Sequence, residues 1–516
     1  MKFISPPAAG AGRLRSLKTT GLRWLYLTHR WVGIFTCLLC AVWFISGLVM
    51  VYVPYPGLSD RDRMTYSEPL SLERVAITPG EALAAAGLKA FPSQIKLATL
   101  RGQPVYRIVD GKSRITVSAV DGRPVPATTP AQAEETVRRL MPDHQVGPAR
   151  TLFHDQWTVA QGFDPHRPLL RVPVRDAAGL TLYVSSRTGE VVNDTTRWER
   201  GWNWLGSIPH WIYLTVIRQD NEVWRQVIMW TSGPALVGAV AGAWIGILRM
   251  RLKSGQPVSP YLGWMQWHHL AGLIGGLFAI LWVFSGWLSV NPFHLFPRRE
   301  VPPAAMRVYA GHKAATYPAS LAVLRGLPPG DAREARFIWV GGRPLIVLMG
   351  PDLSEPVIDG QTGASAAQTD AALFEAARAL VPGAQAAFAE RLTQEDAYWY
   401  STRRDQRRLP VLRVGFADPA GTWVHIDPTT GEVLGRSDRS RRLYRWLFSA
   451  IHAWDLPIFR GSDLARQIVI WVLSTAGLVL SVSGVVVGWR HLKLKAGIRP
   501  SRPIRKFRAN RKARTS

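Results

Sequence analysis

Apolar and polar residues are strongly segregated along this chain of 516 residues. A bilayer core of about 30 Å takes roughly 20 helical residues to cross. Four apolar runs are long enough, at approximately 31–53, 223–248, 270–290 and 465–489. Two polar blocks, about 54–205 and 291–445, separate the first run from the second and the third from the fourth. The pattern predicts an α-helical membrane protein with four spans and two large inserted domains.

Within each polar block, helical periodicity is followed by strands with alternating apolar positions. The helical patterns lie at 78–89, 130–140 and 370–381, and the segment TWVHIDPTTGEVLG at 422–435 is the fullest strand–turn–strand example. We therefore predict four small α+β modules, two in each block. Each is expected to contain a tight turn in which glycine supplies a positive φ. These turns are Asp121-Gly122, Thr188-Gly189, Asp359-Gly360 and Thr430-Gly431.

The sequence also repeats itself on a larger scale. The first and third apolar runs align without a gap at a spacing of 239 residues, which pairs His29 with His268. A second alignment, at a spacing of 242 residues, pairs segments 170–172 and 188–191 with 412–414 and 430–433, and His210 with His452. Duplication of a span–domain–span unit explains both alignments. It predicts two parallel two-helix repeats related by an axis along the membrane normal.

The net charge of +27 is unevenly distributed. Residues 1–30 hold six Lys or Arg, the loop 249–253 holds three, and the tail from residue 490 holds eleven, all without an acid. Positive residues beside spans mark the cytoplasmic side, so both termini and the central loop are predicted inside and both polar blocks outside. A basic tail is also typical of nucleic-acid binding, but topology already accounts for the charge and no nucleic-acid partner is expected. The first run is too long for a signal-peptide core, and we interpret it as an uncleaved signal anchor.

Three features together carry a resemblance to a known family. They are a two-span unit that begins with a histidine, a V-x-x-x-T-G-E-V hairpin, and a Trp-Leu pair shortly before a further histidine and the next span. This combination resembles the bacterial PepSY-associated transmembrane proteins, which include iron-regulated inner-membrane proteins and siderophore reductases. The resemblance covers about 21–491 and implies a multi-pass inner-membrane protein with PepSY modules in the periplasm. In the reductase members it implies b-type haem in the membrane.

The fold class expected from this resemblance is four transmembrane helices, as two parallel repeats, with two periplasmic α+β inserts that are each a tandem of PepSY-like modules. The cytoplasmic segments are a basic tail at 1–20, a loop at 251–263 and a basic tail at 492–516. The membrane segments are 21–53, 201–250, 264–293 and 441–491, of which the second and fourth begin with an interfacial helix. The two periplasmic pairs of modules are 54–200 and 294–440.

Histidine is costly beside hydrocarbon, so an intramembrane histidine is a functional hypothesis by default. His29 and His268, the inner pair, each begin a strip of mostly small residues at helical spacing. Small residues favour close helix packing, but the same strips could leave room for a flat macrocycle whose iron the histidines hold. The strips are Gly33, Thr36, Cys40, Trp43 and Gly47 in the first span, and Gly272, Gly275, Ala279, Trp282 and Gly286 in the third.

His210 and His452, the outer pair, precede the second and fourth spans in aromatic segments that are typical of interfacial helices. Two histidines on one haem iron suit electron transfer, because they leave no open position on the metal. We therefore predict two b-type haems, one for each pair, with the four histidines as iron ligands.

Several alternatives stay open. His269 could replace His268, and His491 could serve the inner haem. Arg249 and Arg490 could bind propionates or mark the cytoplasmic boundary. A zinc site is possible, although the spans supply no further Cys, Asp or Glu beside the pairs except Cys37 and Cys40, which we expect to be packing residues. The remaining histidines have no repeat partner and are expected to be surface or structural residues: His144, His154, His166, His294, His312 and His425.

Two functions remain in competition. The first is a haem-dependent ferric siderophore reductase that takes electrons from a cytoplasmic reductase, flavin, NAD(P)H or quinol. Its iron chelate could contact Tyr398-Trp399-Tyr400 and the basic run 403–408, although a strand and a charged loop are the simpler explanation of these residues. The second is a non-enzymatic, membrane-anchored PepSY regulator or scaffold, which gives no reason for paired histidines. A transporter is the third candidate. Gly238, Gly242 and Gly246 lie at GxxxG spacing, but this spacing indicates tight helix packing and does not by itself favour transport.

Overall fold

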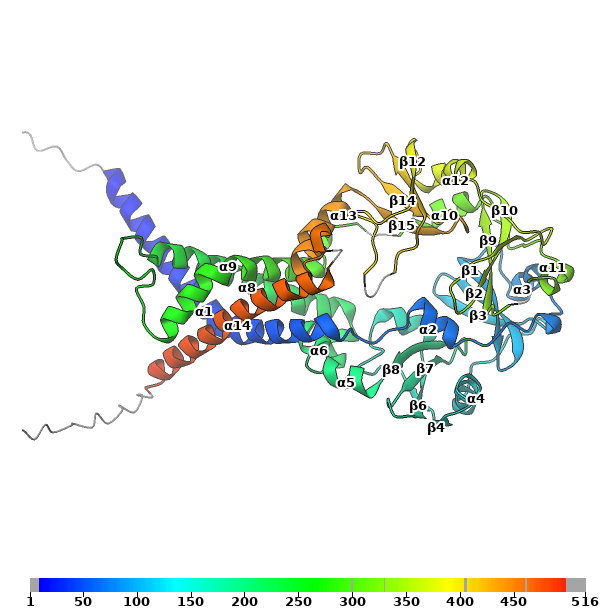
Figure 1. Cartoon of the computed structure of the whole chain (residues 1–516), viewed down its shortest axis with the longest axis horizontal. Coiled ribbons are helices and arrows are strands. Elements are labelled where there is room, and N and C mark those ends of the chain that lie inside the picture. The colour runs from blue at the N-terminus through cyan, green and yellow to red at the C-terminus, as the bar shows by residue number, and fades with distance from the viewer. Residues whose placement is uncertain (1–8, 298–299, 329, 403–405, 460–461, 498–516) are drawn as a thin grey trace, which may run out of the picture. The chain divides into compact units, whose positions relative to one another are not determined.

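The computed structural model describes residues 9–297, 300–328, 330–402, 406–459 and 462–497 (Figure 1). Most of the two predicted basic tails therefore lies outside the described residues, as do residues 403–405 of the basic run. By internal contacts the chain divides into two units. The helical unit comprises 1–44, 231–283 and 471–516, and the sheet unit comprises 45–230 and 284–470.

Within the described residues, four helices are long and apolar enough to cross a membrane. They confirm the four predicted spans. The first candidate span is Thr19–Tyr52. The four helices are α1 (Ala9–Tyr52), α8 (Asn221–Arg249), α9 (Trp264–Ser289) and α14 (Asp463–Lys495).

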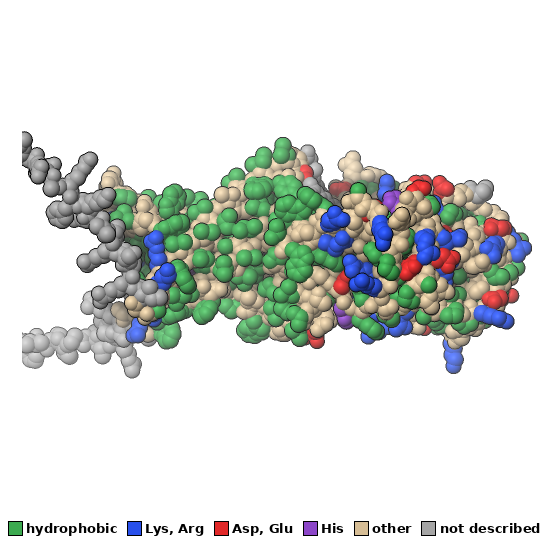
Figure 2. Space-filling view, turned by 90° about the horizontal axis from the view of Figure 1, so that it is seen from below, with side chains coloured by type: hydrophobic (Ala, Val, Ile, Leu, Met, Phe, Trp, Pro, Cys, Tyr) green, Lys and Arg blue, Asp and Glu red, His purple; other side chains and the backbone are tan. Residues whose placement is uncertain are grey.

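Small residues allow the helices of the helical unit to approach closely. The position of a Cβ on Gly238 of α8 would lie 2.7 Å from Val32 of α1, and on Gly275 of α9 it would lie 3.4 Å from Ala476 of α14. Figure 2 shows that apolar side chains cover the surface of these helices. Phe35 is 78% exposed there, as expected for a side chain that faces lipid.

A six-stranded antiparallel sheet joins strands from both polar blocks, in the order β11-β10-β9-β1-β2-β3 (Figure 1). The prediction treated each block as a separate pair of modules. The structure instead pairs β1 with β9, so the first module of each block contributes half of one sheet. Local periodicity carries no signal for a pairing across such a sequence separation. The strands are β1 (Gln94–Leu100), β2 (Gln103–Asp110), β3 (Ser113–Ser118), β9 (Glu334–Val340), β10 (Arg343–Met349) and β11 (Val357–Asp359).

The second module of each block has its own sheet. One has the order β4-β6-β7-β8, with β5 also paired to β6, and the other has the order β12-β13-β14-β15. The predicted hairpin at 422–435 is confirmed as β14 and β15. These strands are β4 (Gln145–Val146), β5 (Arg150–Leu152), β6 (Leu169–Arg175), β7 (Thr181–Ser185), β8 (Val191–Thr195), β12 (Ala386–Leu392), β13 (Val411–Phe416), β14 (Trp423–Ile426) and β15 (Val433–Ser437).

The predicted helices of the modules are present and begin at capping residues. Thr78 and Thr129 each form a capping box with the residue three positions on, which satisfies the first free N–H groups of the helix. Each helix packs against the strands of its module through a few buried apolar residues, such as Leu83 and Val137. The helices are α3 (Pro79–Ala85), α4 (Pro130–Leu140), α11 (Leu321–Arg325) and α12 (Asp370–Ala377), and α2 (Asp60–Thr65) and α10 (Pro303–Ala310) precede the modules.

One turn geometry occurs in all four modules. A glycine with positive φ donates its N–H to the carbonyl four residues earlier. The side chain of that earlier Ser or Asp accepts from the N–H groups two and three positions on, as in an Asx turn. Three predicted glycines are confirmed, but Gly360 is wrong: Gly363 has the positive φ of +77°, because Asp359 is the leading residue of the turn. The four turns run Ser118–Gly122, Ser185–Gly189, Asp359–Gly363 and Asp427–Gly431.

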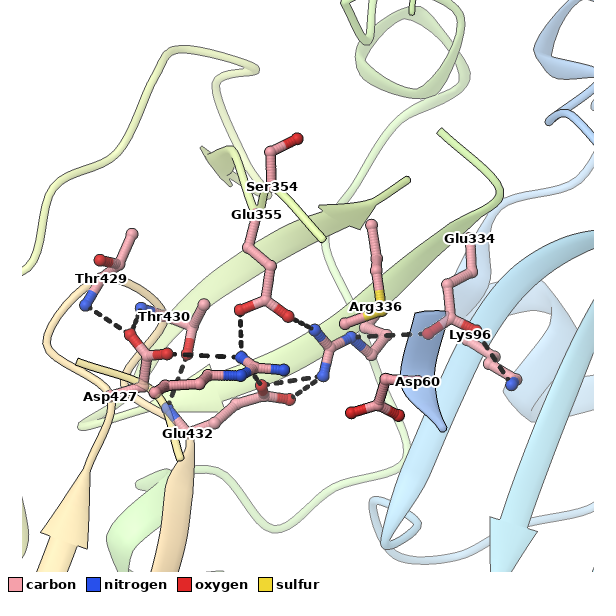
Figure 3. A network of polar contacts seen from close by, with 12 residues as sticks. Asp60, Lys96, Glu334, Arg336, Ser354, Glu355, Asp427, Thr429, Thr430 and Glu432 are labelled. Atoms are coloured by element: carbon pink, nitrogen blue, oxygen red, sulfur yellow. Dashed lines mark hydrogen bonds and ion pairs between the residues drawn. The ribbon is translucent and has the colours of Figure 1, made fainter. Parts of the chain in front are cut away.

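A buried network of acids and bases ties two of these turns to the six-stranded sheet. Figure 3 shows the part of this network around Arg336 and Glu432. Lys96 of β1 and Arg336 of β9 are register partners. Lys96 Nζ lies 2.8 Å from Glu190, the glutamate of the first Thr-Gly-Glu-Val turn, and 3.0 Å from Glu334. Arg336 lies 2.6 Å from Glu432, the glutamate of the second such turn. Lys96 and Arg336 are therefore neighbouring buried bases of the sheet, and the glutamate of one turn lies beside each of them and offsets its charge.

The network also perturbs acidity. Burial alone would raise the pKa of Glu334, but Lys96 and Arg63 outweigh it and lower that pKa to about 2. Glu355 is paired with Arg336 and Arg408, yet burial is the larger influence and raises its pKa. Glu334 is 3% exposed, so removing one of its partners would leave a buried charge uncompensated.

Short helices lead from each block to the next span, as predicted. In the first block they are α5 (Arg197–Asn203), α6 (Ser207–His210) and α7 (Thr215–Arg218). In the second block α13 (Arg439–Tyr444) continues into one π-helical segment, η5 (Arg445–Ala450), and the helix runs on through His452. π-Helical turns inside helices are frequent at functional sites.

Candidate paired-histidine sites

The structure brings the inner pair together. His29 comes from α1 and His268 from α9, and the centroids of their rings lie 6.1 Å apart with an interplanar angle of 33°. The two residues are more than two hundred positions apart in sequence. Their proximity follows from the packing of α1 and α9 within the helical unit, where Phe44 and Trp282 also contact each other at 5.6 Å.

Backbone carbonyls orient both rings of the inner pair. His29 Nδ1 lies 2.9 Å from the carbonyl oxygen of Gly238 in α8. His268 Nδ1 lies 3.2 Å from the carbonyl oxygen of Leu480 in α14 and 3.3 Å from Ser483 Oγ. A carbonyl only accepts, so each Nδ1 must carry the proton. In the neutral imidazole the lone pair is then on Nε2, which is the form that ligates a metal.

A glycine one helical turn after each carbonyl makes room for the ring. A Cβ on Gly242 would lie 2.7 Å from His29 Nδ1 and closer still to Cε1. A Cβ on Gly484 would lie 3.2 Å from His268 Cε1 and 2.6 Å from Cys37 Sγ. Each partner helix thus presents a carbonyl and, four residues later, a glycine. The sequence suggested only helix packing for Gly242, and it gave no signal for Leu480 or Gly484.

The outer pair is assembled in the same manner within the sheet unit. The ring centroids of His210 and His452 also lie 6.1 Å apart, with an interplanar angle of 66°. Here the partners of Nδ1 are serine hydroxyls: Ser46 Oγ lies 3.1 Å from His210, and Ser285 Oγ lies 3.0 Å from His452. Each serine is followed by a glycine whose Cβ would meet the ring, at 3.2 Å for Gly47 and 3.5 Å for Gly286.

The spacing within both pairs fits two imidazoles on one metal. Metal–nitrogen bonds of about 2 Å, with about 1 Å from each nitrogen to its ring centre, put the centroids ~6 Å apart. Ordinary ring packing also gives such distances. What distinguishes these pairs is that every Nδ1 has a hydrogen-bond partner and every ring lies over a glycine. The residues therefore fit a haem, whose iron the two histidines of each pair would hold.

Zinc fits these residues less well. Within the described residues, no group of three or more His, Cys, Asp or Glu side chains gathers around a point that could hold a metal ion. Structural zinc takes four protein ligands, and catalytic zinc takes three. Haem asks for only two from the protein, because the macrocycle supplies the other four nitrogens.

The comparison with protein families bears on the same part of the chain. Residues 345–516 match the family model of the PepSY-associated TM region. The match confirms the predicted resemblance over this range, which contains the turn glutamate Glu432, His452 of the outer pair, and Leu480 and Gly484 beside His268. No curated protein matches the chain.

The two alternatives for the inner ligand lie elsewhere. His269 Nε2 lies 2.9 Å from the Gly246 carbonyl and its Nδ1 3.0 Å from Ser259 Oγ, so both of its nitrogens are engaged. Through these two hydrogen bonds His269 connects the loop before α9 to the end of α8. Because neither of its nitrogens is left for a metal, the geometry favours His268 as the ligand. His491 packs edge-on against Trp31 at 6.3 Å.

The two arginines of the cytoplasmic boundary differ from each other. Arg249 Nε lies 2.5 Å from Tyr26 Oη, with its guanidinium over the tyrosine ring. Arg490 is exposed. Both propionate contacts stay predictions.

The strips of small residues serve helix packing in α9. A Cβ on Gly272 would lie 3.6 Å from Leu480, and on Gly275 it would meet Ala476, both in α14. In α1, Cys37 packs against Gly484, as expected for a packing cysteine. Gly33 of α1 differs from these glycines of α9. Among the described residues, only Cys37 of the same helix would lie within 4 Å of a Cβ on Gly33. The packing interpretation therefore holds for α9, and open space adjoins α1.

The aromatic segment proposed to contact an iron chelate is partly core. Trp399 is 4% exposed, stacks on His425 at 4.3 Å and donates through Nε1 to the Arg408 carbonyl. Tyr398 and Tyr400 are half-buried. His425 is structural: it accepts from Arg413 at 3.0 Å, and burial, reinforced by that arginine, lowers its pKa to about 3. A chelate contact at Trp399 is therefore not supported.

Proposed function

We propose that this chain is a b-type haem electron-transfer protein of the bacterial inner membrane, and that it reduces a ferric siderophore or other iron chelate on the periplasmic side with cytoplasmic electrons. The observation that carries the proposal is the recurrence of one site plan. Two histidine pairs have the same 6.1 Å ring spacing, a hydrogen-bond partner at each Nδ1 and a glycine under each ring. Helix packing alone requires none of these three features.

The residues have distinct tasks in this proposal. His29 and His268 ligate one iron, and His210 and His452 ligate the other. The Gly238 and Leu480 carbonyls hold the inner rings and fix their tautomer, and Ser46 and Ser285 hold the outer rings. A bound haem supplies reversible one-electron iron chemistry, and ligation on both faces leaves no position open for other reactions at the metal. Reduction favours iron release, because Fe(II) is a softer ion than Fe(III) and oxygen-rich chelators hold it more weakly.

The proposal includes the architecture of two parallel repeats with cytoplasmic termini and periplasmic modules. The equivalent partners support it: α1 pairs with α8 at Gly242 as α9 pairs with α14 at Gly484. The four modules share one turn geometry, and β1 and β9 meet as equivalent strands. The excess of Lys and Arg beside the spans supports the orientation.

The test uses the full chain purified in detergent. Reduced anaerobically with one equivalent of dithionite per haem, it should be reoxidised on mixing with a ferric hydroxamate or catecholate. Release of Fe(II) should accompany the return of the oxidised Soret band. His452→Ala should slow this reoxidation.

Two results would contradict the proposal. A colourless protein, made with ample haem supply, would leave the membrane-anchored PepSY regulator as the better account. A haem protein that no ferric chelate reoxidises would contradict the reductase role alone.

A further inference from the structure

The two histidine pairs differ in the chemistry of their hydrogen-bond partners. In the inner pair, both Nδ1 atoms face backbone carbonyl oxygens, those of Gly238 at 2.9 Å and Leu480 at 3.2 Å. In the outer pair, both Nδ1 atoms face serine hydroxyls, at 3.1 and 3.0 Å. The difference applies to both members of each pair, so it is a property of the site.

The outer serines are not incidental polar residues. Ser46 is 1% exposed and Ser285 is fully buried, each near the end of an apolar helix. A buried hydroxyl is costly unless it is hydrogen-bonded. Serines within helices commonly donate to the carbonyl four residues earlier, which leaves an oxygen lone pair for the imidazole N–H.

An acceptor at Nδ1–H changes the ligand strength of the imidazole. Hydrogen-bond donation from Nδ1 raises the basicity of the ring, and a more basic ligand stabilises the oxidised, more positive iron. A peptide carbonyl is a stronger acceptor than a hydroxyl, since resonance places more negative charge on its oxygen. The inner pair should therefore hold iron at a lower reduction potential than the outer pair, other influences being equal.

We propose that Ser46 and Ser285 are positioning residues whose hydroxyls, as weaker acceptors than the carbonyls of the inner pair, leave the outer site at a higher reduction potential than the inner site, and so favour electron flow from the cytoplasmic to the periplasmic side. This inference rests on the proposed function, and it adds a specific task for residues that do not themselves touch the iron. It gives a reason for the Ser-Gly pairs Ser46-Gly47 in α1 and Ser285-Gly286 in α9, which lie beside the rings of the outer pair. Beside the inner pair, a backbone carbonyl and a glycine take their place.

The experiment is a spectroelectrochemical titration of the full chain in detergent. His29→Ala, which retains only the outer ligands, and His210→Ala, which retains only the inner ligands, assign the two steps. The outer step should be the higher one. Ser46→Ala and Ser285→Ala each remove one acceptor. Each variant should raise the equilibrium constant for reduction of the outer haem several-fold and leave the inner step unchanged. A tenfold change corresponds to 59 mV for a one-electron couple.

Two controls separate tuning from general damage. Ser483→Ala removes a hydroxyl 3.3 Å from His268 Nδ1 but leaves the Leu480 carbonyl, so it should move the inner step less than Ser46→Ala moves the outer one. Ser474→Ala removes another buried serine of α14 and should move neither. The low-spin ferric EPR signal of the outer haem should change in the Ser46→Ala and Ser285→Ala variants only.

The outcomes are distinct. A wild-type protein in which the inner step is the higher one overturns this inference without any variant. If the chain holds two haems and the serine variants leave both potentials unchanged, or shift both equally, this inference is overturned while the proposed function stands. A protein without haem overturns both.

Discussion

Gly242→Ala places one methyl group against the ring of His29. The added Cβ would lie 2.7 Å from Nδ1 and nearer to Cε1, whereas ordinary van der Waals contact begins at 3.4 Å. The neighbour is a ring held between helices and cannot rotate away as the end of a long side chain would. The ring must therefore retreat by more than half an ångström, and the 2.9 Å hydrogen bond to the Gly238 carbonyl lengthens or breaks.

The cost can be estimated from these two effects. Overpacking of a well-packed site costs about 1–3 kcal/mol, and the net loss of a hydrogen bond adds about 0.5–1.5 kcal/mol. A total of about 1.5–4.5 kcal/mol corresponds to a loss of roughly 10- to 1,600-fold in the affinity of the inner site for its haem. The outer pair does not involve Gly242 and should keep its haem.

The assay is a pyridine haemochrome on the purified variant, which should fall from near two haems per chain to near one. Gly246→Ala is the matched control: it changes the same residue type one turn further along α8, where the nearest atom to the new Cβ is Leu273 at an ordinary 3.5 Å. It should keep both haems. Full haem occupancy in Gly242→Ala, with the spectrum of the inner haem unchanged, would refute this geometry of the inner pair.

Three further predictions concern stability and the role of single residues. Lys96→Met should lower the unfolding free energy by about 3 kcal/mol, since it leaves two buried carboxylates with only their arginine partners, Arg63 and Arg107. The double variant with Glu334→Leu should recover part of the loss in a thermal melt. The lowered pKa of Glu334 means that its carboxylate contributes fully above about pH 4.5, and that this contribution declines below that pH and is lost below about pH 2. Lys96→Met/Glu334→Leu should therefore show a weaker loss of thermal stability on acidification from pH 5 to 3 than the wild type, and an equal loss would argue against the ion pair. His269→Leu should keep two haems while lowering the melting temperature, because it removes both hydrogen bonds of a structural histidine; loss of one haem would make His269 the ligand.

The spans and the helices of the modules could be predicted from the sequence because both rest on local patterns. Twenty consecutive apolar residues identify a span without knowledge of its neighbours, and Thr129 followed by an amphipathic run identifies the start of α4. The turns were predictable for the same reason. Gly360 was wrong because the segment 359–363 contains two glycines, and only the hydrogen bond from Gly363 to Asp359 distinguishes them.

The six-stranded sheet could not be predicted in this way. Pairing of β1 with β9 joins residues about 240 positions apart, and nothing in either strand alone selects the other. The partners of Lys96 and Arg336 were likewise hidden, although the glutamate of each Thr-Gly-Glu-Val turn was visible as a repeated residue. Its role became apparent only with the ion pairs to the sheet.

The histidine pairs lie between these cases. The internal repeat singled out the four histidines as two equivalent pairs, and the structure places the members of each pair side by side. The carbonyls of Gly238 and Leu480 are main-chain groups, which no pattern of side chains reveals. Gly242 looked like half of a packing motif, because GxxxG spacing does not say whether a helix or a ring fills the space.

The most direct test of the central claim is to count haems in the wild type and in four single variants, His29→Ala, His268→Ala, His210→Ala and His452→Ala, by pyridine haemochrome with oxidised and reduced spectra. The account predicts near two low-spin haems per chain in the wild type and the loss of one in every variant, with one common residual spectrum for His29→Ala and His268→Ala and another for His210→Ala and His452→Ala. A wild-type protein without a Soret band, or variants whose losses do not group by pair, would contradict it.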